Sequence, residues 1–209
     1  MERFRHRLAR ISSIGSASEG GRGCGPTLGG GAATAVAVSA ALLLAATAVS
    51  ARSAPRVVAI IPTGGKQPCA SVEAFGRVWV TDLGSGAITS IDPDTNEVDA
   101  PNIVIGGQPC GIVAGGGSLW VNGYGTNSVD RVDPVTRRLV QRIPVGNSPY
   151  DVAYGFGSVW TTNEGDGTVD RIDPRTGKVI RRIDTESAPT GLSITAGAVW
   201  VAANTSTFV

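Results

Sequence analysis

Residues 149–177, PYDVAYGFGSVWTTNEGDGTVDRIDPRTG, decide the fold of this chain because they hold one clear copy of a pattern that recurs along it. Apolar and polar residues alternate in short runs, as the two-residue period of a β-strand requires. Between the runs, the segments GFG, EGDG and DPRTG supply residues that favour tight turns. The segment and the residues after it therefore predict four short strands, at 150–154, 158–163, 168–173 and 178–184.

The same features return about every 40 residues. The recurring positions are the tryptophans Trp79, Trp120, Trp160 and Trp200, the prolines Pro68, Pro109, Pro149 and Pro189, and the Asp-Pro pairs that begin at Asp92, Asp133 and Asp173. A large ring at a fixed place in each repeat is suited to filling the space between neighbouring sheets. Four antiparallel strands in a repeat of this length are typical of a propeller blade. We therefore predict an all-β chain, a partial β-propeller of about 3.5 to 4 blades.

The repeat also predicts the organisation of the chain. Residues 1–51 form a targeting segment and 52–209 an incomplete propeller. Within the propeller, the expected parts are an outer strand at 56–62, blades at 68–105, 109–146 and 149–184, and a partial blade at 189–204. No stretch beyond Ala51 carries the apolar spacing of an amphipathic helix, which excludes a helical solenoid.

The repeat resembles the YVTN-type propellers and the related streptogramin (virginiamycin B) lyases. The resemblance rests on the run from Pro149 to Trp160 and on Val169–Gly177 (VDRIDPRTG), and it covers 56 to about 201. It implies a ring of seven blades closed by an N-terminal outer strand, so we expect a truncated product or a fragment. A ring assembled from two chains is the alternative.

For catalysis, the resemblance to the lyases implies histidine for proton transfer and a divalent metal. The single histidine here is His6, which lies in the targeting segment. We therefore predict no catalytic residue, no metal site and no cofactor in the folded part. The competing hypothesis is a lyase of this type whose catalytic blades are missing from the chain.

Two cysteines occupy matching places in neighbouring blades, since Cys69 follows Pro68 and Cys110 follows Pro109. Three states remain open for them: a disulfide between blades, two separate thiols, or a thiolate metal site without an obvious third ligand. Cys24 precedes the apolar run and is too early to join them.

Charge and hydropathy describe the two ends differently. The targeting segment holds five arginines against two acids, and it ends with 20 uncharged residues at 32–51. This pattern is typical of export. Cleavage after Ala48 or Ala51 is expected, with an uncleaved membrane anchor as the alternative. The rest is slightly acidic, with thirteen Lys or Arg against fifteen Asp or Glu, which argues against nucleic acid as a partner.

The predicted function is non-enzymatic binding or scaffolding outside the cytoplasm, for a small molecule or a cell-envelope protein or polymer. A membrane sensor domain would need the apolar run to stay uncleaved. Candidate ligand contacts lie around the mouth of the central channel of the propeller, where the first strand of a blade begins and its second strand ends. They are Cys69, Cys110, Tyr150, Asp151, Asp82, Asn122, Asn163 and Thr190. The turn 163–167 is expected to be a plain hairpin turn, with calcium binding as the alternative. The recurrent arginines are expected to protect strand edges in solvent, with an anionic polymer as the alternative: Arg131, Arg137, Arg138, Arg171, Arg181 and Arg182.

Overall fold

The computed structural model describes residues 56–185, 187–195 and 197–204. All of them belong to the unit Ala54–Val209. The predicted targeting segment, with its cleavage sites and apolar run, therefore lies outside the described residues. No helix in the described part of the chain has the length and apolar character that a membrane span needs.

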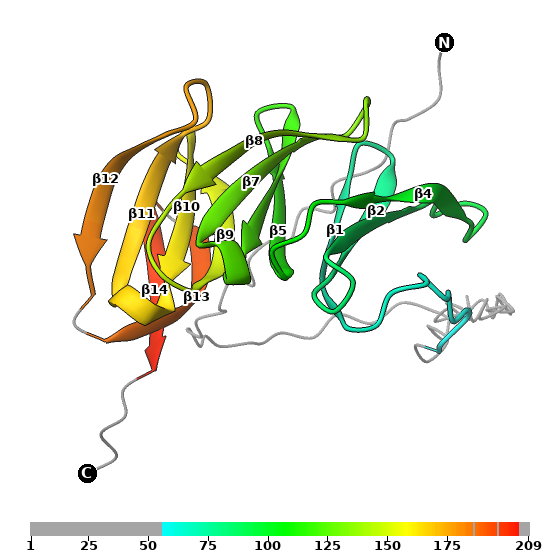
Figure 1. Cartoon of the computed structure of the whole chain (residues 1–209), viewed down its shortest axis with the longest axis horizontal. Helices are drawn as coiled ribbons and strands as arrows, with labels where there is room; N and C mark the ends of the chain where they lie inside the picture. The colour runs from blue at the N-terminus through cyan, green and yellow to red at the C-terminus, as the bar shows by residue number, and fades with distance from the viewer. Residues whose placement is uncertain (1–55, 186, 196, 205–209) are drawn as a thin grey trace, which may run out of the picture. The chain divides into compact units, whose positions relative to one another are not determined.

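The described residues form three four-stranded antiparallel sheets and one two-stranded sheet, in which strands that are consecutive in sequence pair with one another (Figure 1). Blade 1 contains β1 (Pro68–Ala74), β2 (Arg77–Asp82), β3 (Ala87–Ile91) and β4 (Val98–Val104). Blade 2 contains β5 (Pro109–Gly115), β6 (Ser118–Gly123), β7 (Ser128–Asp133) and β8 (Arg138–Pro144). Blade 3 contains β9 (Pro149–Gly155), β10 (Ser158–Asn163), β11 (Thr168–Asp173) and β12 (Lys178–Asp184). Blade 4 contains β13 (Ala188–Thr195) and β14 (Ala198–Asn204).

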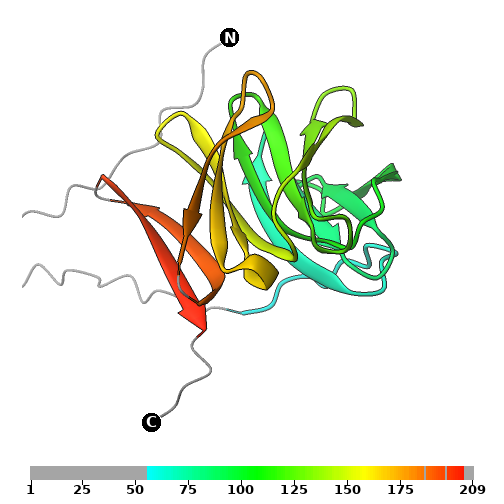
Figure 2. The ribbon, with the colours of Figure 1, turned by 60° about the vertical axis from the view of Figure 1, so that its left-hand side comes forward.

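The blades follow one another in chain order, and their first strands β1, β5, β9 and β13 make successive contacts (Figure 2). This arrangement confirms the predicted all-β class and the partial propeller. Each blade has two ends. We call the end with the turns between its first and second and its third and fourth strands the turn end. The opposite end, which carries the remaining connections, is the loop end.

The recurring tryptophans fill the seams between blades in three of four cases. Trp79, Trp120 and Trp160 are 2%, 0% and 9% exposed, and each indole N–H donates to a carbonyl of the preceding strand at 3.0–3.1 Å. Two apolar clusters span the seams, one joining blades 1 and 2 and the other joining blades 2 and 3. Trp200 is the exception at 59% exposed, because no described strand continues the sheet beyond β14.

The Asp-Pro turns explain why the turn end repeats so regularly. Asp133 Oδ1 accepts backbone N–H bonds from Val135 at 2.8 Å and Thr136 at 3.0 Å, and Asp173 Oδ1 accepts one from Arg175 at 2.8 Å. These bonds favour the ionised carboxylate, so they hold the pKa of both aspartates below the ordinary value. The sequence repeat is therefore a repeat of turn chemistry as much as of packing.

Buried ion pairs hold the third and fourth strands of blades 2 and 3 together. Asp130 and Asp170 are fully buried, and each accepts two hydrogen bonds from one arginine, Arg142 or Arg182, at 2.7–2.9 Å. Arg142 also donates to Ile105 O at 2.7 Å, which ties blade 2 to the connection from blade 1. Arg182, expected only to protect a strand edge, therefore neutralises a buried carboxylate.

Residues 56–62, predicted as an outer strand, form no strand in the structure. Val57, Val58 and Ile60 are 81%, 81% and 90% exposed. A strand is stabilised by pairing with a neighbour, and no described strand pairs with this segment. The sequence similarity to the outer strands of other blades was therefore insufficient to predict its conformation.

Candidate functional site

Blades 2 and 3 cover their tryptophans in the same way. On the third strand of each sheet, an arginine lies directly opposite the indole, so that Arg131 stacks over Trp120 at 5.4 Å and Arg171 over Trp160 at 5.2 Å. Each arginine Nε donates at 2.9 Å to a serine at the start of the second strand, Ser118 or Ser158. These arginines were expected to be solvated edge residues, but cation–π stacking gives them a packing role.

Blade 1 exchanges these residue types. Its residue opposite Trp79 is Ser90, and Arg77 begins the second strand where blades 2 and 3 have serine. The neighbouring residue on β4 is Asp99, whose carboxylate accepts bonds from Arg77 Nε at 2.9 Å and from Ser90 Oγ at 2.8 Å. The exchange leaves the Trp79 ring without an arginine from its own sheet.

The Trp79 ring is covered by an arginine from blade 2. Arg137, in the turn between β7 and β8, crosses the seam and stacks over the Trp79 ring at 5.9 Å. Its guanidinium donates to Asp99 O at 3.1 Å, to Pro101 O at 2.8 Å and to Ser90 Oγ. Arg137 therefore links blade 2 to blade 1.

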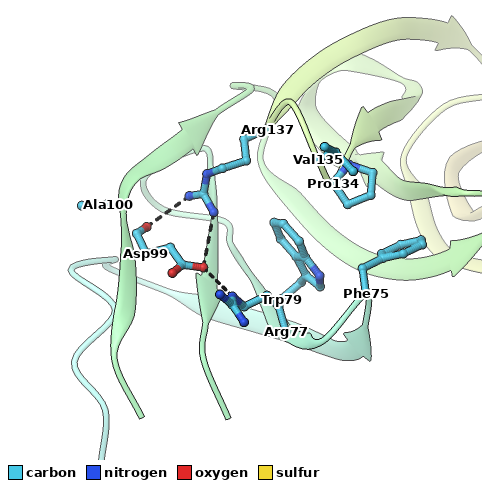
Figure 3. Close-up of a pocket in the computed structure, with 8 residues that line it drawn as sticks. All are labelled: Phe75, Arg77, Trp79, Asp99, Ala100, Pro134, Val135 and Arg137. Carbon is cyan, nitrogen blue, oxygen red and sulfur yellow. Dashed lines mark hydrogen bonds and ion pairs between the residues drawn. The ribbon is translucent and has the colours of Figure 1, made fainter. Parts of the chain in front are cut away.

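Beside Arg137, the turn end of the blade 1–blade 2 seam opens into a cleft of about 480 Å³. We call it the seam cleft. In Figure 3, Trp79 lies between an apolar side and a polar side of the cleft. Its lining residues are Phe75, Arg77, Trp79, Asp99, Ala100, Pro134, Val135 and Arg137. The volume is within the range of small-ligand sites, about 300–1,000 Å³.

Two lining residues adopt a backbone conformation that side chains disfavour. Phe75 and Arg137 have φ angles of 54° and 56°. In blade 2 the residue that corresponds to Phe75 is Gly116, and in blade 3 the residue that corresponds to Arg137 is Gly177. Five other non-glycine residues have a positive φ as well, among them Phe156 at the matching turn of blade 3, so this conformation belongs to the turns of the repeat and does not by itself mark the cleft.

The polar side of the cleft is electrically balanced. Arg77 pairs with Asp92 at 3.2 Å and with Asp99 at 2.9 Å, and Arg137 lies 3.6 Å from Asp99. The Ser90 hydroxyl, followed by the two arginines, holds the pKa of Asp99 below its ordinary value. Asp99 is therefore a stable carboxylate that orients two guanidinium groups, and this arrangement is suited to binding.

The described residues contain no group of three or more His, Cys, Asp or Glu side chains placed to hold a metal ion. The turn considered for calcium begins with a short 3₁₀ turn, Glu164–Asp166, and ends with Gly167 at φ 64°. Within it, the Asp166 carboxylate accepts bonds from Asn147 N at 2.8 Å and Asn147 Nδ2 at 2.7 Å. Asp166 therefore fixes a connection between blades.

The eight residues predicted as ligand contacts lie at the loop end, away from the seam cleft, and four of them join blades. Cys69 and Cys110 form a disulfide between β1 and β5, with their Cα atoms 5.1 Å apart. Asp82 is buried and accepts N–H bonds from Gln67 at 2.8 Å and Ser85 at 2.6 Å. Burial acts to raise the pKa of Asp82, but the bonds from Ser85, Lys66 and Gln67 lower it overall.

The other predicted contacts differ in what they bind. Asp151 accepts the N–H of Leu192 at 2.8 Å, which joins blade 3 to blade 4, and Asn122 Nδ2 donates to Pro149 O, which joins blade 2 to blade 3. Asn163 Nδ2 donates within its own blade, to Thr168 Oγ1 at 3.0 Å and Asp170 Oδ2 at 3.1 Å. Thr190 Oγ1 donates to Ala202 O at 3.5 Å, whereas Tyr150 is 46% exposed. Their role in ligand binding stays a prediction.

The seam cleft was missed because the sequence analysis emphasised what the repeats share. The available signal was a departure from the repeat: Arg77 where two blades have serine, and Ser90 where they have arginine. Phe75 gave no such signal, because blade 3 has Phe156 at the same turn position. A comparison of repeat positions would have pointed to this seam, although not to the reach of Arg137 across it.

These features define a β-propeller repeat protein. A family model described as "Repeat of unknown function (DUF6923)" matches residues 108–207. A search of the curated proteins found no match.

Several solved structures are similar to the chain. Virginiamycin B lyase from Staphylococcus aureus, as a catalytically inactive histidine-to-alanine variant with quinupristin, has 18% identity and a TM-score of 0.58 over 65% of this chain and 48% of that one. BamB from Moraxella catarrhalis has 12% identity and a TM-score of 0.54 over 65% and 41%. The computationally designed Ika4 protein has 15% identity and a TM-score of 0.62 over 72% and 93%. The chain thus covers less than half the length of these two natural proteins, and the likeness shows the fold alone.

Proposed function

We propose that this chain is a non-enzymatic binding or scaffolding propeller that acts outside the cytoplasm, and that its ligand occupies the seam cleft. The observation that carries the proposal is the cleft itself. It is a hollow of about 480 Å³ with Phe75 49% exposed and Val135 85% exposed over a buried indole. Exposed apolar side chains beside oriented donors are the usual composition of a binding site.

Two features support action outside the cytoplasm. The arginine-rich start and the uncharged run at 32–51 have the pattern of an export signal or a membrane anchor. The Cys69–Cys110 disulfide suits an oxidising compartment, since thiols in the cytosol are kept reduced. N-terminal sequencing of the protein recovered from fractionated cells tests this part of the proposal. A mature start after Ala48 or Ala51 supports it, and recovery of the intact chain from the cytosol contradicts it.

The competing function is a lyase of the virginiamycin B type. The structural likeness favours it, but that likeness shows only the fold. The solved complex with quinupristin is of an inactive variant lacking one histidine, and this chain has only His6. Linearisation of quinupristin by the purified chain would overturn the binding function.

The binding site itself is tested by a fragment screen with protein-observed NMR. We expect neutral aromatic fragments to shift the signals of Trp79 and Val135, and we expect Phe75→Gly to abolish those shifts. The matched control is Tyr150→Ala, which removes an exposed aromatic ring at the loop end and should leave them unchanged. Shifts that depend on Tyr150 and not on Phe75 would move the site to the loop end.

A further inference from the structure

We propose that the seam cleft receives a partner polypeptide in extended conformation, anchored by one uncharged aromatic or branched side chain. This inference rests on the proposed function and names the partner class for the same cleft. Three properties of the cleft support it: balanced charge, an apolar wall and free donors.

The charge of the cleft disfavours an ionic anchor. Arg77 and Arg137 are matched by Asp92 and Asp99, which they approach in three N···O contacts of 2.9–3.6 Å. An anionic or a cationic ligand would bring a charge for which this paired set holds no unpaired counter-charge. A ligand group without charge displaces neither partner, so it is bound at the lowest electrostatic cost.

The apolar wall fits a side chain of a polypeptide. Phe75 and Val135 are exposed on facing turns of two blades, with Pro134 beside Val135 (Figure 3). An aromatic or branched side chain placed between them would cover both and would rest near the Trp79 ring. Tryptophan and arginine, which are both among the lining residues of this cleft, are enriched among the residues that dominate protein interfaces.

Free donors on the polar side of the cleft suit a peptide backbone. Among the hydrogen bonds of the described residues, none uses Arg77 Nη2 or Arg137 Nε. A peptide carbonyl next to the anchoring side chain is a neutral acceptor that could bind either donor. An apolar side chain flanked by carbonyl groups is what an extended polypeptide presents at every other residue.

The corresponding positions of the blade 2–blade 3 seam lack these properties. There Gly116 replaces Phe75, Arg175 replaces Val135, and a Cβ at Gly177 would collide with the Gln141 side chain. Arg131 Nη1 donates across that seam to Pro174 O at 3.4 Å. The contrast supplies substitutions that the fold already accepts at matching positions.

The test measures binding of the peptides acetyl-Gly-Gly-X-Gly-Gly-amide to the full chain by isothermal titration calorimetry, with Phe, Leu, Ala, Asp or Lys at X. We expect the Phe and Leu peptides to bind about tenfold more tightly than the others, the effect of roughly one buried anchor. Phe75→Gly and Val135→Arg should each weaken the Phe peptide about tenfold. The matched control is Phe156→Gly, which removes a ring 51% exposed at the same turn position of blade 3 and should change nothing.

Three outcomes would overturn the inference. The Asp or Lys peptide binds as tightly as the Phe peptide, or Phe156→Gly weakens binding as much as Phe75→Gly, or no peptide binds. In the last case, the fragment screen distinguishes the two proposals. Fragments that bind at Phe75 while peptides do not would exclude a polypeptide partner and keep the cleft as a binding site, whereas the failure of both would reject the cleft.

Discussion

Removing the Cys69–Cys110 disulfide should strongly destabilise the propeller. The perturbation is the double substitution Cys69→Ser and Cys110→Ser, made in a chain that also carries Cys24→Ser so that no other thiol interferes. Because the disulfide joins the first strands of blades 1 and 2, its loss lets the unfolded chain separate those strands freely while the folded contacts of the seam remain.

The magnitude follows from the length of chain that the disulfide closes. The two cysteines are 41 residues apart in the sequence. In the chain-entropy treatment, a loop of this length restricts the unfolded state by about 13 cal/mol/K, or about 4 kcal/mol at 25 °C. For a folded unit of this size, that loss corresponds to a fall of about 8 to 16 °C in the melting temperature.

The measurement is urea unfolding followed by tryptophan fluorescence, with and without reductant. The Cys24→Ser chain should lose about 4 kcal/mol of unfolding free energy when reduced, and the triple variant should match the reduced chain under both conditions. If the oxidised parent and the triple variant unfold within about 1 kcal/mol of each other, the two cysteines do not link the blades.

Two further predictions concern charge. Arg142→Met leaves the Asp130 carboxylate buried without its partner, so the unfolding free energy should fall by about 2 to 3 kcal/mol, less than for a fully enclosed pair because Arg142 is 38% exposed. Its exposed neighbour Arg138 supplies the control, since Arg138→Met should cost no more than about 0.5 kcal/mol, and equal effects would reject a role for the pair. The lowered pKa of Asp99 means that its contribution to stability is present above about pH 4 and is lost as the pH falls through the folded-state pKa. Unfolding free energies measured from about pH 6 down to pH 2 should therefore fall less steeply for Asp99→Asn than for the parent, with Asp94→Asn as the control, and parallel curves would contradict the Asp99 network.

The blades could be predicted from the sequence because the residues within each repeat determine its own strands and turns. Alternation, tight-turn residues and the Asp-Pro turns specify each sheet without reference to the rest of the chain, so blade 3 could be derived from about 40 consecutive residues. The buried indoles of Trp79, Trp120 and Trp160 follow from the same pattern. Local chemistry of this kind can be recognised in a single sequence.

What the sequence could not predict depends on contacts between repeats. Residues 56–62 have the composition of an outer strand, but a strand also needs a neighbour, and composition does not show whether one is there. Asp151 and Asn122 join neighbouring blades through hydrogen bonds that the sequence did not predict, because their polar groups meet backbone groups across a seam. The crossing of Arg137 into blade 1 has the same origin.

The central claim is that the repeats stack as sheets with their indoles enclosed in the seams. Hydrogen exchange at the four indole N–H groups, resolved by two-dimensional NMR, tests it most directly. The structure predicts slow exchange for Trp79, Trp120 and Trp160, whose N–H groups are bonded to carbonyls, and fast exchange for Trp200, which is 59% exposed. Four indoles that exchange at similar rates, or a Trp200 slower than the other three, would contradict this stacking.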